Sequence, residues 1–460
     1  MKPIISAAQL RNALNSISRQ TPLQKLNAAK PYNYFLTAIE SSPQTHTEPL
    51  SITFQELLHP SLGDIEWSVQ INFVVEMEFL LRQYTMAGCS GKPLFILHGD
   101  ERIPNGTRSQ VTTHFIKMNS AYATHHTKMM LFGYKDGSMR VIVSTANLFE
   151  EDWRNHVQGL WISDRLPPIK SENKASIGGE SVTGFRNDLA KYLEAYKLAH
   201  LNPFIKRIRN ADFSSVNVFL VTSIPGTSDQ WTNDNAHGYS RVQWLLQRHC
   251  EPINDTTPLV VQCSTFGNLG AAGNGWLNEF KTNLCRDSQS NIGRKMSPIQ
   301  IIYPTKNNVL RSYDGAHGGG SLLYDRRRHE AQQWLNEFLY QWRANERHRT
   351  RAMPHIKTYA RFTDQKLHWF ILTSANLSKS AWGWQKTKKK FEVSNYEAGV
   401  LFLPKFVTKT KYFAMDASDQ TTPVFPKVYD IPLIRYQTDD RPFFREDVLD
   451  DVLPNGCPIA

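Results

Sequence analysis

Short apolar runs alternate with amphipathic segments along the whole chain. The runs end at turn residues, a pattern typical of buried strands. Such strands are expected at residues 93–98, 216–221, 259–263 and 301–303. Apolar residues at helical spacing predict helices at residues 185–199, 239–249 and 330–342. Because strands and helices alternate in both halves, we predict an α/β fold with helices on the sheet faces.

The segment of residues 129–143 predicts a β-hairpin. An Asp-Gly pair at residues 136–137 lies between two apolar runs, which is a strong hairpin signal. If these two residues form the loop, His126 and Asn147 lie opposite each other at the open end; a bulge or a longer loop would shift this register by one residue. Side chains alternate along a strand, so His126 and Lys128 would point to one place.

These polar residues recur in the second half of the chain. The matched pairs are His126 and His355, Lys128 and Lys357, Asn147 and Asn376, and Trp153 and Trp382. All four pairs have the same offset (355 − 126 = 229), which indicates an internal repeat. A turn at residues 365–366 would again place the His opposite the Asn. The chain therefore carries two half-sites, one in each half.

The repeat predicts two domains of similar structure. A chain of 460 residues is long enough for two or three domains with cores of their own. The polar segment of residues 208–215 separates the halves, so we place the domains at residues 1–212 and 213–460. Two similar halves that face each other would bring both half-sites to their interface, where ligand sites tend to lie.

The residue types of the paired motifs suit phosphoryl transfer. Lys128 and Lys357 would supply two fixed cations, and Asn147 and Asn376 amide donors, for the charge that develops on the equatorial oxygens. A neutral imidazole is a nucleophile, and a pKa of about 6.5 lets a second imidazole exchange protons near neutral pH. A single His-x-Lys is usually a surface strand; its duplication with the Asn favours a functional site. His125 would face away from Lys128, so we interpret it as structural or as a residue that supports the side chains of the site.

No motif with metal-ligand spacing accompanies the pairs. The sequence has no Asp-x-Asp-x-Asp loop, no His-Glu-x-x-His and no Cys-x-x-Cys. Two lysines can provide the charge that a pair of metal ions provides in other sites. We therefore expect a site with no metal and no other cofactor.

Charge, cysteine spacing and the length of the apolar runs indicate which partners and which compartment to expect. The formal net charge of +11 favours an acidic partner, with nucleic acid first. The five cysteines are scattered without motif spacing, which fits a reducing compartment. No apolar run approaches the ~20 residues of a transmembrane helix, and the N-terminus lacks the apolar core of a signal peptide, so we expect no membrane partner.

Residues 264–270 form a second candidate site. They follow a predicted strand and are mostly small or hydroxylated, which suits capture of an anion by backbone N–H groups. The alternative is a plain turn into a helix at residues 276–280, and the pattern favours neither.

The two His-x-Lys motifs resemble those of the phospholipase D superfamily, but they depart from its usual pattern at one position. In that superfamily an Asp stands five positions after each Lys. Here Gly133 and Phe362 stand at those positions, while the Asn of each half remains. This variant, with the Asn-Tyr-Glu sequence that ends at Glu397, resembles the tyrosyl-DNA phosphodiesterase family over residues 30–445. The resemblance implies a phospholipase D-like fold, with two similar α-β-α sandwich domains related by pseudo-twofold symmetry.

The resemblance also implies an activity and roles. It implies a nuclear, monomeric DNA-repair phosphodiesterase that removes topoisomerase I-derived tyrosine or peptide from single- or double-stranded DNA 3′ ends without metal. His126 would be the nucleophile that forms a covalent 3′-phosphohistidine, and His355 the general acid and base. The supporting residues implied are Lys128, Lys357, Asn147 and Asn376 around the phosphoryl oxygens, with Gln158 and Glu397 beside the histidines.

Contacts with DNA are implied in the same way. Tyr122 resembles a family aromatic that stacks on DNA; the alternative is a core aromatic. The implied phosphate contacts are Ser264, Thr265, Phe266, Gly267, Asn268 and Ser378. Two other functions stay open at this point, a phospholipase or general nuclease of the same superfamily and a non-catalytic module that binds DNA ends. The missing Asp pair and the lack of a membrane-facing amphipathic helix argue against a lipid substrate.

Overall fold

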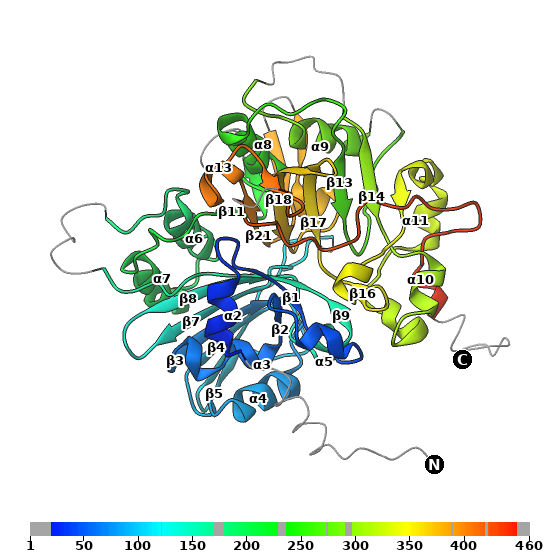
Figure 1. Cartoon of the computed structure of the whole chain (residues 1–460). Coiled ribbons are helices and arrows are strands. Elements are labelled where there is room, and N and C mark those ends of the chain that lie inside the picture. Colours follow the sequence, from blue (N-terminus) through cyan, green and yellow to red (C-terminus); the bar gives the residue numbers. More distant parts are fainter. Residues whose placement is uncertain are drawn as a thin grey trace, which may run out of the picture.

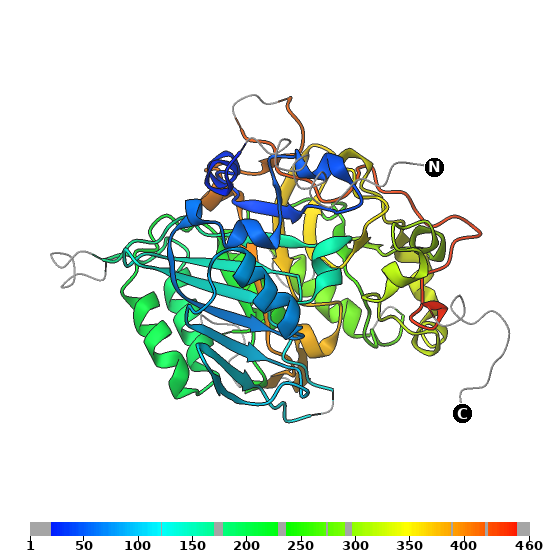
Figure 2. The ribbon, with the colours of Figure 1, turned by 90° about the horizontal axis from the view of Figure 1, so that it is seen from below.

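The computed structural model describes most of the chain. It covers residues 20–120, 122–169, 178–228, 236–272, 275–289, 297–387, 390–418 and 422–448. Two mixed β-sheets, one from each half of the chain, carry helices along their faces (Figures 1 and 2). Within these ranges no helix is long and apolar enough to cross a membrane.

The first sheet has nine strands, in the spatial order β2-β1-β10-β8-β7-β3-β4-β6-β5. The strands are β1 (Tyr34–Thr37), β2 (Ser51–Ile52), β3 (Ile65–Asn72), β4 (Leu94–His98), β5 (Gly106–Arg108), β6 (Val111–Phe115), β7 (Met129–Tyr134), β8 (Met139–Ser144) and β10 (Gly159–Ile162). The predicted first hairpin is β7 and β8, at the centre of this sheet.

The second sheet has eight strands, in the order β11-β21-β18-β17-β13-β14-β15, with β22 also paired to β18. The strands are β11 (Phe219–Ser223), β13 (Leu259–Gln262), β14 (Ile299–Ile302), β15 (Leu339–Tyr340), β17 (Thr358–Phe362), β18 (Lys366–Thr373), β21 (Glu397–Phe402) and β22 (Phe413–Ala414). The predicted second hairpin is β17 and β18.

Seven strands of each sheet correspond one to one. The order β1-β10-β8-β7-β3-β4-β6 matches β11-β21-β18-β17-β13-β14-β15, and each step has the same parallel or antiparallel sense in both sheets. This equivalence confirms the predicted fold, two similar α/β domains. The boundary at residue 212 lies in the stretch between the two sheets and stays a prediction.

Helices flank both sheets. They are α2 (Pro22–Ala28), α3 (Phe54–Leu57), α4 (Met77–Met86), α5 (Glu150–Arg154), α6 (Phe185–Glu194), α7 (Asn202–Arg209), α8 (Gly238–His249), α9 (Trp276–Leu284), α10 (Lys306–Leu310), α11 (Arg326–Glu330), α12 (Lys379–Trp382) and α13 (Pro404–Val407). Side chains alternate across β7: Met130 and Phe132 face the core that contains α4, whereas Met129 and Leu131 face the larger core with Phe185 of α6. Buried strands with helices on both faces explain why the sequence reads as nearly continuous apolar runs.

The second sheet departs from the predicted sandwich on one face. α8 and α9 cover one face, but irregular C-terminal segments cover part of the other. The ring of Phe425 lies 4.8 Å from that of Phe370 and 6.0 Å from that of Phe402. An apolar sheet face has to be buried, and here a loop buries it in place of a helix.

Two small sheets complete the fold. One contains β12 (Gly226–Ser228), β20 (Lys390–Val393) and β19 (Trp384–Thr387). The other joins the two halves, because β9 (His156–Val157) pairs in parallel with β16 (Met353–Pro354). These two short strands directly precede Gln158 and His355, so their pairing fixes how the half-sites face each other.

The register of the first hairpin differs from the prediction by one residue. Met129 pairs with Val143, and the N–H of Tyr134 donates to the carbonyl of Ser138. The loop therefore has three residues, 135–137, not the predicted two. Gly137 has φ of 87°, the left-handed residue that closes a three-residue hairpin loop.

The register of the second hairpin also differs by one residue. Thr358 pairs with Leu372, so the predicted turn at residues 365–366 is wrong. The N–H of Thr363 donates to the carbonyl of Lys366, which leaves residues 364–365 as the loop. A bulge beside Arg361 then takes up one extra residue of β18.

One predicted helix is wrong and another is too long. Residues 330–342 contain a short 3₁₀ segment, Gln333–Phe338, and then β15, because this stretch has to reach the edge of the second sheet. α6 ends at Glu194, five residues before the predicted end at residue 199. Lys197 has φ of 55°, a left-handed conformation that stops a helix.

Candidate active site

The first His-x-Lys lies just before β7 in extended backbone. The N–H of His126 donates to the carbonyl of Tyr396 at 2.9 Å, so the backbone at this residue is bonded to the other half of the chain. The carbonyl of Lys128 accepts from the N–H of Ser144 at 2.9 Å, which continues the hairpin ladder. Lys128 therefore belongs to its own hairpin, whereas His126 is already at the interface.

The second His-x-Lys has the same arrangement. The N–H of His355 donates at 3.0 Å to the carbonyl of Val157, which belongs to the first half. The carbonyl of Lys357 accepts from the N–H of Thr373 at 3.1 Å. Each histidine is thus positioned by the half of the chain that does not contain it.

Each imidazole has a side-chain partner on Nδ1, again from the opposite half. Glu397 Oε2 lies 2.9 Å from Nδ1 of His126, and Gln158 Nε2 lies 3.1 Å from Nδ1 of His355. Gln158 and Glu397 are equivalent in the two sheets, since each directly precedes or begins the strand next to its hairpin. With both Nδ1 atoms engaged, both Nε2 atoms are left for a ligand.

The sequence analysis missed Asp152. Its Oδ2 lies 3.1 Å from Nδ1 of His355 and accepts from the N–H of Asn147 at 2.6 Å, while its Oδ1 lies 3.4 Å from Nδ1 of His156. Burial raises the pKa of Asp152, but His355 and His156 lower it further, so the pKa is lowered overall and the group is a carboxylate. A carboxylate fixes the proton on Nδ1 of His355, and Gln158 then only packs beside that nitrogen.

Asp152 cannot be found by matching the two halves of the chain. Its counterpart at the constant offset is Ala381 (381 − 152 = 229), which is not ionisable. The acid of the second half, Glu397, comes from a different position of the repeat. The signal that was available was the position of Asp152 beside the matched Trp153, five residues after Asn147.

Both lysines are fully buried. Lys128 Nζ donates to the carbonyl of His126 at 2.8 Å, and Lys357 Nζ donates to the carbonyl of His355. Burial lowers the pKa of Lys128 to about 7, although Glu397 and Asp152 raise it. Burial and the charge of Lys128 hold the pKa of Lys357 well below its usual range. An anion between these ammonium groups would raise both pKa values.

Both histidines are neutral in the free site. Burial lowers the pKa of His126, while the carboxylate of Glu397 raises it in part. Burial lowers the pKa of His355 to about 3, against the opposing effect of Asp152. Lys357 acts electrostatically on His126, and Lys128 acts on His355, so the two half-sites form one site.

The two asparagines differ in their surroundings. Asn376 Oδ1 accepts from both the N–H and the Oγ of Ser264, each at 3.1 Å, which turns its amide NH₂ away from that loop. In the described part of the chain Asn147 Oδ1 is buried with no hydrogen-bond partner. Its backbone is fixed, because its carbonyl accepts from Trp153 Nε1 at 2.9 Å.

A cavity of about 570 Å³ opens onto this site. Its walls include His126, Asn376 and Glu397 together with most of the predicted DNA contacts, namely Tyr122, Thr265, Phe266, Gly267, Asn268 and Ser378. The side chain of His126 is 14% exposed and that of His355 only 7%, so His126 is the more accessible imidazole. Ser264 does not line the cavity; it holds Asn376 instead.

The predicted DNA contacts differ in how exposed their side chains are. Tyr122 is 85% exposed, which excludes a core aromatic, and its role on DNA stays a prediction. Phe266 is fully buried, with its ring 4.7 Å from that of Tyr324, so only its backbone can reach a ligand. A Cβ on Gly267 would lie 2.7 Å from Cβ of Ser378, so this wall requires glycine.

The loop at residues 264–270 is hydrogen-bonded to Asn376 and to its neighbour Leu377. Besides the bond from Ser264 to Asn376, the N–H of Gly267 donates to the carbonyl of Leu377 at 2.9 Å. These two N–H groups are therefore occupied and cannot capture an anion. Thr265 Oγ1 is buried and, in the described residues, has no hydrogen-bond partner, so this hydroxyl is available to a ligand.

His125 is structural, as predicted. Its Nδ1 lies 3.2 Å from the carbonyl of Asn72 and its Nε2 lies 3.0 Å from the hydroxyl of Tyr196. Both ring nitrogens face away from the cavity and toward the core. Among the described residues no group of three or more His, Cys, Asp or Glu could hold a metal ion, and the expectation of a metal-free reaction stays a prediction.

The chain is similar to known proteins along most of its length. The family model described as tyrosyl-DNA phosphodiesterase matches residues 33–437. Tyrosyl-DNA phosphodiesterase 1 of Drosophila melanogaster is 48% identical over 438 residues, which cover 92% of this chain and 75% of that protein. The Arabidopsis thaliana protein of the same name is 32% identical over 371 residues, 74% of this chain and 58% of that protein.

A solved structure agrees in fold. The crystal structure of yeast tyrosyl-DNA phosphodiesterase superposes with a TM-score of 0.67 at 20% identity, over 89% of this chain and 98% of the yeast chain. At that identity the likeness concerns the fold alone. The family match and the Drosophila relative, however, cover most of the chain, so this protein belongs to the tyrosyl-DNA phosphodiesterase family of the phospholipase D superfamily and is a phosphodiesterase.

Proposed function

We propose that this protein hydrolyses 3′-phosphotyrosyl bonds at single- or double-stranded DNA ends, of the kind left by trapped topoisomerase I, and acts as a monomer in the nucleus. The observation that carries the proposal is the pair of imidazoles from opposite halves. Each has its Nδ1 engaged by a group of the other half, so both Nε2 atoms remain available for one phosphate.

In the first step His126 Nε2 attacks phosphorus. A P–N bond forms, and the bond from phosphorus to the tyrosine oxygen breaks with its electron pair on that oxygen. Glu397, at 2.9 Å from Nδ1, stabilises the positive charge that develops on the imidazole. The lysines and the amide of Asn376 stabilise the charge on the phosphoryl oxygens.

The leaving phenolate takes its proton from Nε2 of His355. In the free site burial lowers the pKa of His355 to about 3, so few molecules carry this proton before the substrate binds. The bound phosphodiester anion would offset the charges of Lys128 and Lys357 and raise that pKa. Asp152 holds the second proton on Nδ1, so the imidazolium donates only from Nε2.

In the second step water attacks phosphorus and gives a proton to Nε2 of His355. The P–N bond breaks, and its electron pair returns to His126. The products are DNA with a 3′-phosphate and free tyrosine or peptide. His355 is again an imidazolium, and it loses this proton to solvent when the phosphate product leaves, because its pKa in the free site is about 3.

The test is release of tyrosine from a 3′-phosphotyrosyl oligonucleotide with EDTA present. We expect DNA with a 3′-phosphate as product and no internal cuts. Retention of the tyrosine would contradict the proposal, internal cuts would favour a general nuclease, and loss of activity in EDTA would contradict the metal-free reaction. Hydrolysis of a phospholipid instead would favour a phospholipase.

The division of labour between the histidines has its own test. His355→Ala removes the group that activates water, so a covalent protein–DNA adduct should accumulate on denaturing gels. The matched variant His126→Ala should give no adduct. Mapping of the adduct by mass spectrometry should place the phosphate on His126; a phosphate on another residue would overturn the assignment.

A further inference from the structure

The two residues that flank His126 are joined by a network of hydrogen bonds behind the site. Thr127 Oγ1 bonds to the hydroxyl of Tyr192. That hydroxyl lies 3.0 Å from the hydroxyl of Tyr196, which lies 3.0 Å from Nε2 of His125. All four side chains of this tyrosine network are buried. We propose that Tyr192 and Tyr196 are positioning residues that hold His126 for its attack on phosphorus, an inference that rests on the proposed function.

The hydrogen bonds of the tyrosine network all run in one direction. Burial lowers the pKa of His125 to about 3, so its ring is neutral and carries one proton. Nδ1 of this ring lies 3.2 Å from the carbonyl of Asn72, which can only accept, so the proton is on Nδ1. Nε2 therefore accepts from Tyr196, Tyr196 accepts from Tyr192, and Tyr192 accepts from Thr127. Each hydroxyl donates its one proton once, so every group of the network has its partner.

Both ends of the tyrosine network lie beside His126. Thr127 follows it in the sequence. At the other end Asn72 precedes Phe73, whose ring lies 5.6 Å from the imidazole of His126. Side chains alternate along extended backbone, so His125 and Thr127 point away from the cavity that His126 lines. The network thus fixes the backbone on both sides of the imidazole.

Tyr196 also links His126 to the acid that contacts it. The ring of Tyr196 stacks on that of Tyr396, with centroids 4.4 Å apart and planes at 15°. The carbonyl of Tyr396 accepts from the N–H of His126, and its own N–H donates to the carbonyl of Thr124 at 3.1 Å. The next residue, Glu397, lies 2.9 Å from Nδ1 of His126. One tyrosine therefore contacts both the segment of the imidazole and the segment of its carboxylate.

The helix α6, which carries Tyr192, is bound to both halves of the chain. It packs against β11 where the halves meet (Figure 1). Asp188 Oδ2 of α6 accepts from Arg241 Nη2 of α8 at 2.7 Å. The buried side chains of Phe185 and Leu189 anchor the helix in the larger core. Because the helix is fixed in this way, its tyrosine holds the network in a position that both halves determine.

The residues beside His355 cannot form such a network, because both are apolar. These neighbours, Pro354 and Ile356, match the residues beside His126 at the offset of 229 (354 − 125 = 229). This asymmetry agrees with the proposed roles. A nucleophile has to lie in line with the bond that breaks, and an error of about 1 Å can cost about 100-fold in rate. A proton can also pass through one water, so a general acid tolerates more movement.

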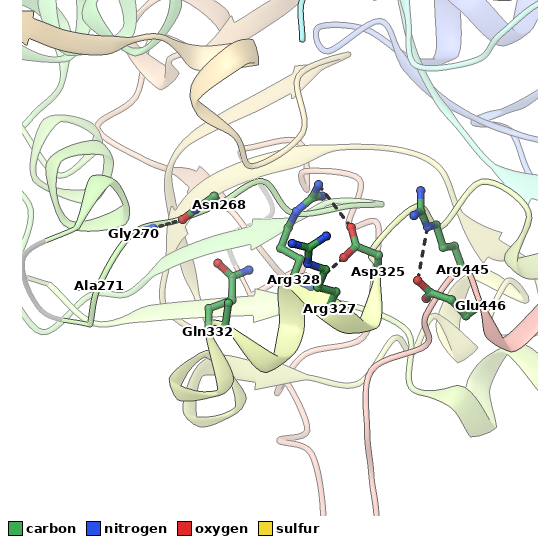
Figure 3. Close-up of a pocket in the computed structure, with 10 residues that line it drawn as sticks. Asn268, Gly270, Ala271, Asp325, Arg327, Arg328, Gln332, Arg445 and Glu446 are labelled. Carbon is green, nitrogen blue, oxygen red and sulfur yellow. Dashed lines mark hydrogen bonds and ion pairs between the residues drawn. The ribbon is translucent and has the colours of Figure 1, made fainter. Parts of the chain in front are cut away.

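In the wall that the second half contributes, hydrogen bonds hold a loop and not a histidine. Figure 3 shows the cavity of about 890 Å³ next to the active site, with Gln332 between α11 and the loop that contains Asn268. Gln332 Oε1 accepts from the N–H of Leu269 at 3.1 Å, and its Nε2 donates to the hydroxyl of Tyr324 at 3.1 Å. These bonds support the wall of the cavity, whereas the tyrosine network supports the imidazole.

The experiment measures the attack step in Tyr196→Phe, which removes the hydroxyl and keeps the ring that stacks on Tyr396. In a His355→Ala background the adduct accumulates, so the rate constant of its formation from a 3′-phosphotyrosyl oligonucleotide reports the attack by His126. With the protein in saturating excess, we expect this rate constant to fall about tenfold or more in Tyr196→Phe. A smaller folded fraction would not change a first-order rate constant, so the readout separates positioning from stability.

The matched control is Tyr84→Phe in the same background. The hydroxyl of Tyr84 is also buried, donates to Ser68 Oγ at 2.8 Å and accepts from Gln70 Nε2 at 3.0 Å, but it lies in the core that contains α4. Its loss should change the rate constant of attack less than twofold. Tyr192→Phe should slow attack as Tyr196→Phe does, and the double variant should be no slower than the slower single variant, because both hydroxyls act through one network.

Three results would overturn the proposal. They are an unchanged rate constant in Tyr196→Phe, an equal fall in Tyr84→Phe, and a double variant in which the two single losses multiply.

Failure of the proposed function would be visible separately. If the wild-type chain releases no tyrosine and forms no adduct, the proposed function fails. NMR spectra of the histidine ring nitrogens still test the network, because they show which nitrogen of His126 carries the proton. The wild-type chain and Tyr84→Phe should carry it on Nδ1, against Glu397, and Tyr196→Phe should show a mixture of both tautomers. The same single tautomer in all three would contradict the inference.

Discussion

Each of the two histidines is held in one tautomer by the acid that contacts it. Glu397 accepts from Nδ1 of His126, and Asp152 accepts from Nδ1 of His355, although the two acids come from different positions of the repeat. Burial and the neighbouring lysines lower the pKa of both imidazoles. The acids therefore set the tautomer, and the lysines and burial set the protonation state.

Replacement of Asp152 tests this assignment. In Asp152→Asn the amide can no longer fix the proton on Nδ1 of His355, so we expect kcat to fall about 100-fold or more. The fall should come from both His355-dependent steps, and the basic limb of the pH profile should shift. Glu397→Gln is the matched control, which should slow attack by His126 instead. An unchanged pH profile in Asp152→Asn would reduce Asp152 to a structural residue.

The buried lysine gives a dependence on pH. Because burial lowers the pKa of Lys128 to about 7, the free enzyme holds this ammonium below that pH and loses it as the pH rises. A phosphodiester keeps one negative charge throughout this range. We therefore expect KM to be lowest below pH 7 and to rise above it, by up to about tenfold per pH unit. A KM that stays flat from about pH 6 to 9 would mean that Lys128 remains charged.

At the scale of single elements, the residue that replaces the superfamily Asp has a packing role. Gly133 lies in β7, and a Cβ built there would lie 2.0 Å from Cε2 of Trp67 in the neighbouring strand β3. The ring of Trp67 in turn lies 4.9 Å from that of Phe204 in α7. An Asp at this position would displace the indole that joins sheet and helix.

A double-mutant cycle measures this contact. Gly133→Ala should destabilise the protein by about 1–3 kcal/mol in urea unfolding, because the core has no room for the methyl group. Trp67→Ala makes that room, so the cost of Gly133→Ala should nearly vanish in the double variant. Additive losses would show that the strand does not need glycine for Trp67.

At the scale of the whole molecule, a buried arginine joins the two halves. Arg349 belongs to the second half and is fully buried, but three of its partners lie in the first: Glu48 Oε2 at 2.6 Å, Ser51 Oγ at 2.6 Å and the carbonyl of Thr37 at 2.9 Å. Because β1 and β2 contain Thr37 and Ser51, this one guanidinium fixes the edge of the first sheet to the second half.

Loss of this arginine should weaken the whole protein. Arg349→Met leaves the carboxylate of Glu48 and the carbonyl of Thr37 without a donor, so we expect a loss of about 3 kcal/mol or more in urea unfolding. Arg351→Met, two residues away and exposed, is the matched control and should cost no more than about 0.5 kcal/mol. Equal losses in the two variants would contradict this role of Arg349.

The repeat, the strands and the His, Lys and Asn of each half-site follow from the order of residues along the chain. A strand alternates its side chains every second residue, and duplication preserves offsets, so the apolar runs and the pairs His126–His355 and Lys128–Lys357 are visible without a structure. The hairpins were found for the same local reason, but their registers were wrong by one residue because a third loop residue and a bulge leave no periodic trace.

How the half-sites meet depends on the packing of the two halves of the chain. Glu397 and His126 are 271 residues apart, and Gln158 and His355 are 197 apart, so their contacts depend on how two sheets dock and not on local pattern. Asp152 was missed because its contact with His355 spans the two halves and its counterpart in the repeat, Ala381, is not ionisable. Local periodicity determines which residues form strands, but the packing of one half on the other determines which side chains meet at one site.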